Sequence, residues 1–339
     1  MDTRRNFLKK TATLSVAGLF TNWAMAELAS DRLGKLLPQR RLTRNGEKVT
    51  AFSLGGYHLG KAPAPALAER LLERSMELGV RFYDNARGYH NGYAEELYGK
   101  FLVPKYRDEI FLMTKSHGRN GSDAQIHLDE SLKAMNTSHT DLWTIHTITT
   151  REDVDNRINN GVLDAFLEAK EKGKTRYLGF SCHTNPKTAL YFIDFLEKRG
   201  LEFDTCQCPV NVTDPGFESF QKHLLPVLLE KEYGIIAMKS MAGGGIIGRR
   251  FDLTPQEFRD EDIKDLTAET PVTLKQMHQY VYSLPVSSLC SGCETVEELE
   301  QNITVLNNLK KLSDAEMKNI EQITAPFAGK HAEHYKRIL

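Results

Sequence analysis

The sequence predicts an α/β chain folded as a (β/α)8 TIM barrel, on three observations. Eight short apolar runs of strand type occur along the chain, each followed by a turn. Between them lie stretches with apolar residues at i, i+3 and i+4, several of which end in glycine, as helices commonly do. Because strands that alternate with helices form parallel sheets with right-handed crossovers, eight such units close into a barrel.

The predicted elements follow one another in regular order. The strand runs cover residues 51–55, 79–84, 109–114, 141–146, 176–181, 203–208, 234–239 and 286–290. The clearest helical stretches cover residues 66–79, 122–136, 160–174, 185–200 and 220–234. Asn45-Gly46, ahead of the first strand, is a strong signal for a β-hairpin. No pattern indicates a second folded domain.

The first 26 residues form a separate segment. A paired arginine in MDTRRNFLKK is followed by an apolar stretch from Thr11 to Trp23 and then by Ala-Met-Ala, which ends at residue 26. This order is typical of a signal peptide, and the arginine pair indicates the twin-arginine export machinery. We expect residues 1–26 to be this signal, residues 27–339 to form the barrel, and the protein to be periplasmic. The alternative is a basic amphipathic N-terminal helix.

The composition is that of an ordinary globular chain. It has 339 residues, 40% hydrophobic and 26% charged, with a net charge of -1. Such a balance gives no electrostatic signature of nucleic-acid binding. No apolar run reaches the ~20 residues that cross a bilayer, so we expect no membrane span after signal cleavage.

Five cysteines indicate no disulfide framework. Cys290-Ser-Gly-Cys293 is open to three readings: a redox pair, half a metal site, or free thiols. A complete zinc site needs further ligands at suitable spacing, and the sequence shows none. Cys206 and Cys208 alternate along a predicted strand, so we expect both to face the helix layer.

Four residues at predicted strand ends suggest catalysis. Asp84, Lys115 and His146 close the second, third and fourth strands, and Tyr89 follows the second. The active site of such a barrel lies at the carboxyl ends of its strands, so these side chains should meet. Tyrosine has a pKa of about 10. A nearby ammonium lowers it, and a carboxylate holds that ammonium charged. The phenol can then protonate a developing alkoxide while the histidine orients the substrate oxygen.

Each of these residues alone has an ordinary structural explanation. A tyrosine or histidine at a strand end is usually a packing residue, a lysine there a solvated charge, and an aspartate a turn former or helix cap. Only their joint appearance at one end of successive strands favours a catalytic reading.

The surrounding motifs resemble the aldo-keto reductases, whose Asp, Tyr, Lys and His occur in this chain order. The similar stretches include GVRFYDNARGYHNGYAEELYGKFL, RYLGFSCH, TCQCPVN, IIAMKSMAGGG and SGCETVEELEQN. The resemblance implies a hairpin that caps the barrel bottom. It also implies hydride transfer between NAD(P)H and an aldehyde or ketone, with Tyr89 as general acid/base. A small carbonyl or alcohol is then the expected substrate.

The resemblance also places a nucleotide in the barrel mouth. No Gly-x-Gly-x-x-Gly follows the first strand, so a Rossmann mode is not expected. Cys182 stands where the family often has asparagine, and a methionine stands where an aromatic residue commonly stacks on the nicotinamide. The implied cofactor-binding residues are Gly56, Tyr57, Ser181, Gln207, Met238, Gly243, Gly244, Ser291, Gly292, Glu298, Gln301 and Asn302.

The expected cofactor leans toward NADH. Relatives that prefer NADPH usually carry Lys or Arg after the eighth strand, where this chain has Gly292 and Glu298. A glutamate repels a 2′-phosphate and accepts a hydrogen bond from a ribose hydroxyl. Arg249 and Arg250 could supply the missing charge if the long loop after the seventh strand, residues 241–270, folds over as a lid rather than lying on the surface.

Two other functions compete with the reductase. One is a non-enzymatic nucleotide-binding scaffold or redox sensor, which export makes reasonable and an intact set of four catalytic groups argues against. The other is a metal-dependent hydrolase, since neutral imidazoles suit zinc. Its candidate ligands are Asp84, His58, His90, His146 and His183.

Overall fold

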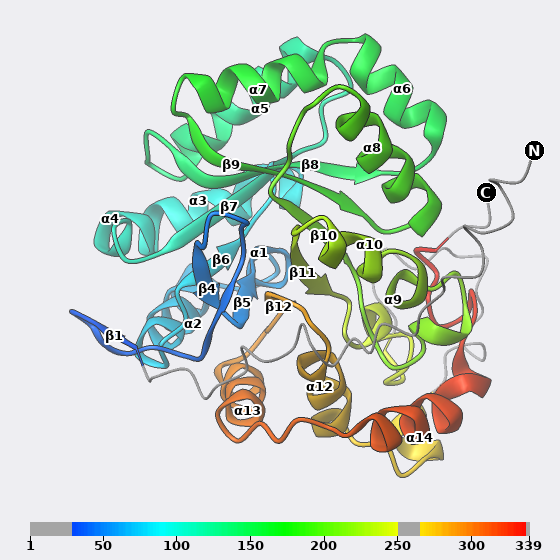
Figure 1. Cartoon of the computed structure of the whole chain (residues 1–339). Helices are drawn as coiled ribbons and strands as arrows, with labels where there is room; N and C mark the ends of the chain where they lie inside the picture. Colours follow the sequence, from blue (N-terminus) through cyan, green and yellow to red (C-terminus); the bar gives the residue numbers. More distant parts are fainter. Residues whose placement is uncertain (1–28, 250–264, 337–339) are drawn as a thin grey trace, which may run out of the picture.

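The computed structural model describes residues 29–249 and 265–336, in which eight parallel strands form a closed barrel (Figure 1). Around the ring their order is β10-β11-β12-β5-β6-β7-β8-β9. The predicted barrel is therefore confirmed. Its strands are β5 (Phe52–Gly55), β6 (Phe82–Asp84), β7 (Phe111–Ser116), β8 (Thr140–Ile148), β9 (Thr175–Cys182), β10 (Thr205–Pro209), β11 (Gly234–Met238) and β12 (Ser288–Ser291).

The strands read as continuous apolar runs because a barrel surrounded by helices buries both of their faces. One cluster of buried side chains fills the barrel interior near its lower end, with Phe82, Met113 and Ile236 among its members. A larger cluster lies between the barrel and the helices. Cys206 and Cys208 belong to this outer cluster, on the face that their alternation predicted. All five cysteines are free thiols.

Helices surround the barrel on its outside (Figure 1). Several begin at a side-chain cap: Asn120 and Thr150 accept hydrogen bonds from the backbone N–H three residues on, and Thr273 forms a complete capping box. The helices are α1 (Gly56–Leu59), α2 (Pro65–Glu77), α3 (Tyr93–Phe101), α4 (Val103–Tyr106), α5 (Gly121–Ala134), α6 (Arg151–Asn159), α7 (Val162–Glu171), α8 (Pro186–Lys198), α9 (Phe220–His223), α10 (Leu225–Glu230), α11 (Leu266–Glu269), α12 (Leu274–Ser283), α13 (Val296–Asn307) and α14 (Asp314–Thr324).

The prediction of one continuous helix over residues 220–234 was wrong. Two short helices, α9 and α10, cover this stretch and meet at Leu224. Pro226 occupies the first turn of α10, where its missing N–H leaves no hydrogen bond unmade. In the middle of a longer helix the same proline would remove a hydrogen bond and clash with the preceding turn.

A β-hairpin closes the lower end of the barrel, as predicted. Its strands are β3 (Gln39–Arg41) and β4 (Lys48–Thr50), paired antiparallel. Gly46 takes a φ of 89° in the turn between them. The carbonyl oxygen of Leu42 approaches the first residue of β11 so closely that a Cβ on Gly234 would lie 1.9 Å from it. A second small hairpin, β1 (Ser30–Asp31) with β2 (Gly34–Lys35), precedes it.

The C-terminal segment lies on loops at the opposite end, above the barrel mouth. Oη of Tyr335 accepts a hydrogen bond from Asn211 Nδ2 in the loop after β10, and Nζ of Lys336 lies 2.7 Å from Oδ1 of Asp214. Residues 331–336 therefore lie against the loop that follows β10 at the barrel mouth. Residues 337–339 lie outside the described part of the chain.

Two predictions concern residues outside the described ranges. The signal peptide, residues 1–26, is one of them. The other is the centre of the loop after β11, residues 250–264, whose described ends meet where Ile247 pairs with Asp265. Among the residues described, no helix is long and apolar enough to cross a membrane.

Candidate active site

Lys115 is hydrogen-bonded to two of the other three predicted catalytic residues, Asp84 and Tyr89. Its ammonium donates hydrogen bonds to Oδ1 of Asp84 at 2.7 Å, to the carbonyl oxygen of Asn85 at 2.8 Å and to Oη of Tyr89 at 3.2 Å. Asp84 ends β6 and Lys115 lies near the end of β7, so the barrel register places the two side by side. Both are almost wholly buried, while Tyr89 keeps part of its surface open to the mouth.

Tyr89 begins a short 3₁₀ turn that follows β6. Its backbone N–H bonds to the carbonyl oxygen of Ala86, and its ring meets that of Tyr57 edge to face, with centroids 5.4 Å apart. His90 holds the same region, since its Nε2 lies 2.8 Å from the carbonyl oxygen of Tyr57. These contacts fix the phenol over the Lys115 ammonium.

His146 reaches the same mouth because β8 is irregular at this point. The register of β8 against β9 shifts between Ile145 and Ile148, and Thr147 takes a φ of 52°. The imidazole of His146 consequently stands edge-on to the Tyr89 ring, with centroids 5.7 Å apart. Burial lowers the pKa of His146 well below its ordinary value, and the positive charge of Lys115 adds to that shift. The ring is therefore neutral and can donate one hydrogen bond.

The pKa of the phenol differs from the sequence-based expectation. Burial raises the pKa of Tyr89 to about 12; the Lys115 ammonium opposes this shift and the Asp84 carboxylate adds to it. For Lys115, burial alone would lower the pKa, but Asp84 and Tyr89 outweigh burial and leave it raised. The expectation of a net lowering at Tyr89 was thus wrong, because desolvation exceeds the effect of one ammonium. At neutral pH the phenol keeps its proton and the lysine its charge.

The residues expected to hold a nucleotide surround the same mouth. They come from the ends of β5, β9, β10, β11 and β12, and from α13. Ser181 Oγ accepts a hydrogen bond from the N–H of Thr147 at 2.8 Å. Asn302 donates to Ser291 Oγ at 3.2 Å. Tyr57 is partly exposed, whereas Ser291 and Met238 are both buried.

The side-chain oxygen of Gln207 is suited to accept a hydrogen bond from a ligand carboxamide. Its Nε2 donates to Oδ2 of Asp84 at 2.9 Å, which fixes the amide orientation and points Oε1 elsewhere. That Oε1 is buried and has no hydrogen-bond partner among the residues that the structure describes. A buried acceptor without a donor costs free energy, so a ligand amide N–H is the group it suits. The side chains present therefore fit the amide end of a nicotinamide.

Three glycines near the mouth occupy positions that disfavour a side chain. A Cβ on Gly292 would lie 1.8 Å from Nδ1 of His58, so only glycine fits there. Gly243 and Gly244 take φ values of 67° and 92° after β11. In such a turn successive backbone N–H groups can converge on an anion.

Glu298 is engaged on two sides. It accepts a hydrogen bond from the N–H of Glu294 at 2.9 Å and another from Arg249 at 3.3 Å. The Glu298 carboxylate and the Arg249 guanidinium, which we expected to influence the choice between NADH and NADPH, are thus neighbours. Arg250 lies outside the described residues.

Two groups at the mouth were not predicted from the sequence to lie beside the catalytic candidates. Cys290, in β12, lies close enough to the Asp84 carboxylate to interact with it, and burial raises the pKa of its thiol well above the ordinary value. Lys239 directly follows β11. Lys115 was selected because a charged residue stands at the end of an apolar run. Lys239 stands in the same kind of position and could have been selected for the same reason.

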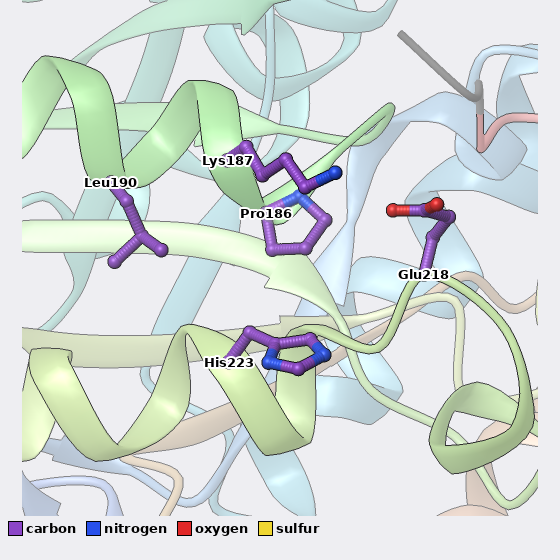
Figure 2. Close-up of a pocket in the computed structure, with 5 residues that line it drawn as sticks. All are labelled: Pro186, Lys187, Leu190, Glu218 and His223. Atoms are coloured by element: carbon purple, nitrogen blue, oxygen red, sulfur yellow. The ribbon is translucent and has the colours of Figure 1, made fainter.

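A separate cavity of about 320 Å³ lies between the start of α8 and the segment that leads into α9. None of the four catalytic candidates lines it. Figure 2 shows Lys187 and Glu218 projecting toward each other from its two sides. Within residues 29–249 and 265–336, no three His, Cys, Asp or Glu side chains are grouped so as to hold a metal ion.

Comparison with known proteins identifies the family. A model of the aldo/keto reductase family matches residues 51–325. The chain belongs to this family. Among its relatives, L-glyceraldehyde 3-phosphate reductase of Escherichia coli (strain K12) is 25% identical over 338 aligned residues, which cover 86% of this chain and 93% of that protein. The uncharacterized oxidoreductase YqkF of Bacillus subtilis (strain 168) is 24% identical and covers 84% of this chain and 96% of its own.

Solved structures agree with the barrel of this aldo/keto reductase. The holo form of aldo-keto reductase AKR11C1 from Bacillus halodurans superposes with a TM-score of 0.69 at 19% identity, over 88% of this chain and 99% of that one. A likeness at that identity shows the fold. Family membership and the oxidoreductase relatives together support a carbonyl-reducing oxidoreductase with a small-molecule substrate.

Proposed function

We propose that this protein is an NAD(P)H-dependent reductase of an aldehyde or ketone, which also catalyses the reverse oxidation, with Tyr89 as the general acid/base. One observation carries the proposal. The Tyr89 hydroxyl lies 3.2 Å from an ammonium that is itself held by a buried carboxylate. A protonated phenol beside a fixed cation is suited to give a proton to an alkoxide.

The roles of the side chains follow from their contacts. Tyr89 donates its proton to the substrate oxygen as negative charge develops there. Lys115 stabilises the phenolate that remains, because an opposite charge next to it favours the ionised form. Asp84 keeps the lysine charged and in position. His146, neutral and edge-on to Tyr89, donates a hydrogen bond that orients the same substrate oxygen.

A nicotinamide nucleotide would supply or accept the hydride when bound. Its carboxamide would be held by Ser181 and by the unpartnered Oε1 of Gln207. Gly243 and Gly244 would offer backbone N–H groups to its phosphates. Ser291 and Asn302, together with the other residues after β12, would hold the adenosine.

A turnover assay with purified protein tests the proposal. Oxidation of NADH and of NADPH is followed while small aldehydes and ketones are added, and nucleotide binding is measured in parallel by calorimetry. Carbonyl-dependent oxidation supports a reductase. Tight nucleotide binding without turnover on any carbonyl would contradict it and favour the nucleotide-binding scaffold.

Export through the twin-arginine pathway to the periplasm is a further part of this proposal. It is supported by the arginine pair at positions 4 and 5, the apolar stretch after it and the Ala-Met-Ala that ends at residue 26. Because that pathway generally carries folded proteins, a reductase can load its nucleotide before it leaves the cytoplasm.

A further inference from the structure

Two lysines face the barrel mouth from opposite sides. β7 and β11 stand four strands apart in the ring of eight, so their carboxyl ends lie across the mouth from each other. Lys115 lies near the end of β7, and Lys239 immediately follows β11. A ligand in the mouth therefore lies between these two ammonium groups.

The two lysines differ in their partners. Asp84 neutralises Lys115 at 2.7 Å. Throughout the described ranges, no carboxylate lies within ion-pair distance of Nζ of Lys239. Its Nζ lies 4.8 Å from the centroid of the Tyr335 ring. An aromatic face attracts a cation but adds no negative charge.

The groups around Lys239 leave its charge uncompensated. Burial lowers the pKa of His58 to about 4 and that of His183 well below the ordinary value, so both imidazoles are neutral. Burial raises the pKa of the Cys290 thiol, which is therefore also neutral. Lys239 thus stands among uncharged groups at the carboxyl end of β11.

The environment of Lys239 is unfavourable without a ligand. Burial lowers the pKa of Lys239 to about 8, which shows how much solvation the ammonium has lost. Its backbone takes a φ of 56°, a strained region that side-chain-bearing residues rarely adopt. Its side chain nevertheless keeps part of its surface open. A desolvated, accessible cation without a counter-ion is suited to receive an anion.

We propose that Lys239 binds an anionic oxygen, a carboxylate or a phosphate, of the ligand that occupies the barrel mouth. The proposal rests on the proposed function, because it assigns the anion to the carbonyl substrate or to the nucleotide. A charge-assisted hydrogen bond in a partly dehydrated site strengthens binding by about 10-fold or more. If the anion belongs to the substrate, the substrate is an acidic carbonyl compound. If it belongs to the nucleotide, the anion is the nucleotide's diphosphate.

Binding is measured first, so that the answer does not depend on turnover. NADH and, separately, succinic semialdehyde are titrated by calorimetry into the wild type, Lys239→Met and Lys239→Arg. Lys187→Met, at the mouth end of α8, is the matched control for loss of one positive charge near the rim. We expect Lys239→Met to weaken one of the two ligands by about 10-fold or more, and Lys239→Arg to restore most of that affinity.

Turnover then identifies the source. Succinic semialdehyde and butanal have the same chain length and differ by a carboxylate. A loss in kcat/KM at least about 10-fold greater for the acidic aldehyde assigns the anion to the substrate, whereas weaker NADH binding assigns it to the nucleotide. Affinities for both ligands that change no more than in Lys187→Met would overturn the proposal. Weaker binding by Lys239→Met together with no carbonyl turnover by the wild type would support the anion site and count against the reductase.

Discussion

The phenol of Tyr89 shares a single ammonium with the carboxylate of Asp84. Nζ of Lys115 lies 3.2 Å from the phenol oxygen and 2.7 Å from the carboxylate. Because burial outweighs the ammonium, the phenol stays protonated at neutral pH. In the mechanism that we propose, the lysine therefore acts chiefly after the proton has left. This arrangement makes different predictions for the forward and reverse reactions.

Carbonyl reduction and alcohol oxidation should respond differently to pH. Reduction needs the protonated phenol, so its kcat should stay nearly level from about pH 7 to 10, below the Tyr89 pKa of about 12. Oxidation needs the phenolate, whose fraction rises about 10-fold per pH unit in this range. Lys115→Met should depress oxidation at each pH, since it removes the charge that opposes the raised pKa. Steady-state profiles in both directions provide the measurement. A level oxidation profile would exclude Tyr89 as the base.

The charge of Glu298 should influence the choice of nucleotide. Its carboxylate repels a 2′-phosphate, so the wild type should bind NADH at least as well as NADPH. Glu298→Arg should shift the preference toward NADPH by ~1–3 kcal/mol, the range for a charged hydrogen bond. Calorimetric titrations of both nucleotides measure this shift, with Arg249→Ala for comparison. A strong wild-type preference for NADPH that Arg249→Ala abolishes would place the phosphate on Arg249 instead.

Lys336 should anchor the C-terminal segment. Its ammonium is fully buried, 2.7 Å from Asp214, 2.9 Å from Glu333 and 2.7 Å from the carbonyl oxygen of Phe217. Lys336→Met leaves two buried carboxylates without their cation, a change that typically costs ~3–5 kcal/mol. Because the C-terminal segment can detach and expose the two carboxylates to water, the loss of unfolding free energy is smaller than this. We therefore expect a lower Tm together with faster proteolysis near the C-terminus. The exposed Lys330→Met is the control. Unchanged Tm and cleavage would contradict the anchoring role.

The N-terminal segment should direct export and then be removed. Mature protein should begin at Glu27, and replacing Arg4 and Arg5 with lysines should retain the precursor in the cytoplasm. Cell fractionation followed by N-terminal sequencing measures both. Intact Met1 on extracytoplasmic protein would contradict cleavage, and unaltered export of the lysine variant would contradict the twin-arginine route.

The sequence predicted those parts of the molecule that depend on local pattern. Apolar runs marked every barrel strand because both faces of a parallel barrel are buried. Asp84, Lys115 and His146 were found because each occurs where such a run ends. Pro226 was a visible signal for the break between α9 and α10, but the apolar periodicity across it outweighed the proline in the prediction.

Features that depend on distant contacts were not predictable in this way. The raised pKa of Tyr89 comes from burial in the folded protein, which no single motif indicates. Lys336 and Asp214 are more than one hundred residues apart in the sequence, and only the folded barrel brings them together.

The most direct test of the account is the rate of carbonyl reduction by Tyr89→Phe. This substitution removes only the hydroxyl, so the ring should keep its edge contacts with Tyr57 and His146. With an aldehyde that the wild type reduces, and with equal nucleotide affinity verified by titration, we expect kcat to fall by ~100-fold or more, the usual scale for loss of a general acid. Near wild-type turnover by Tyr89→Phe would contradict the assignment of Tyr89 as the proton donor.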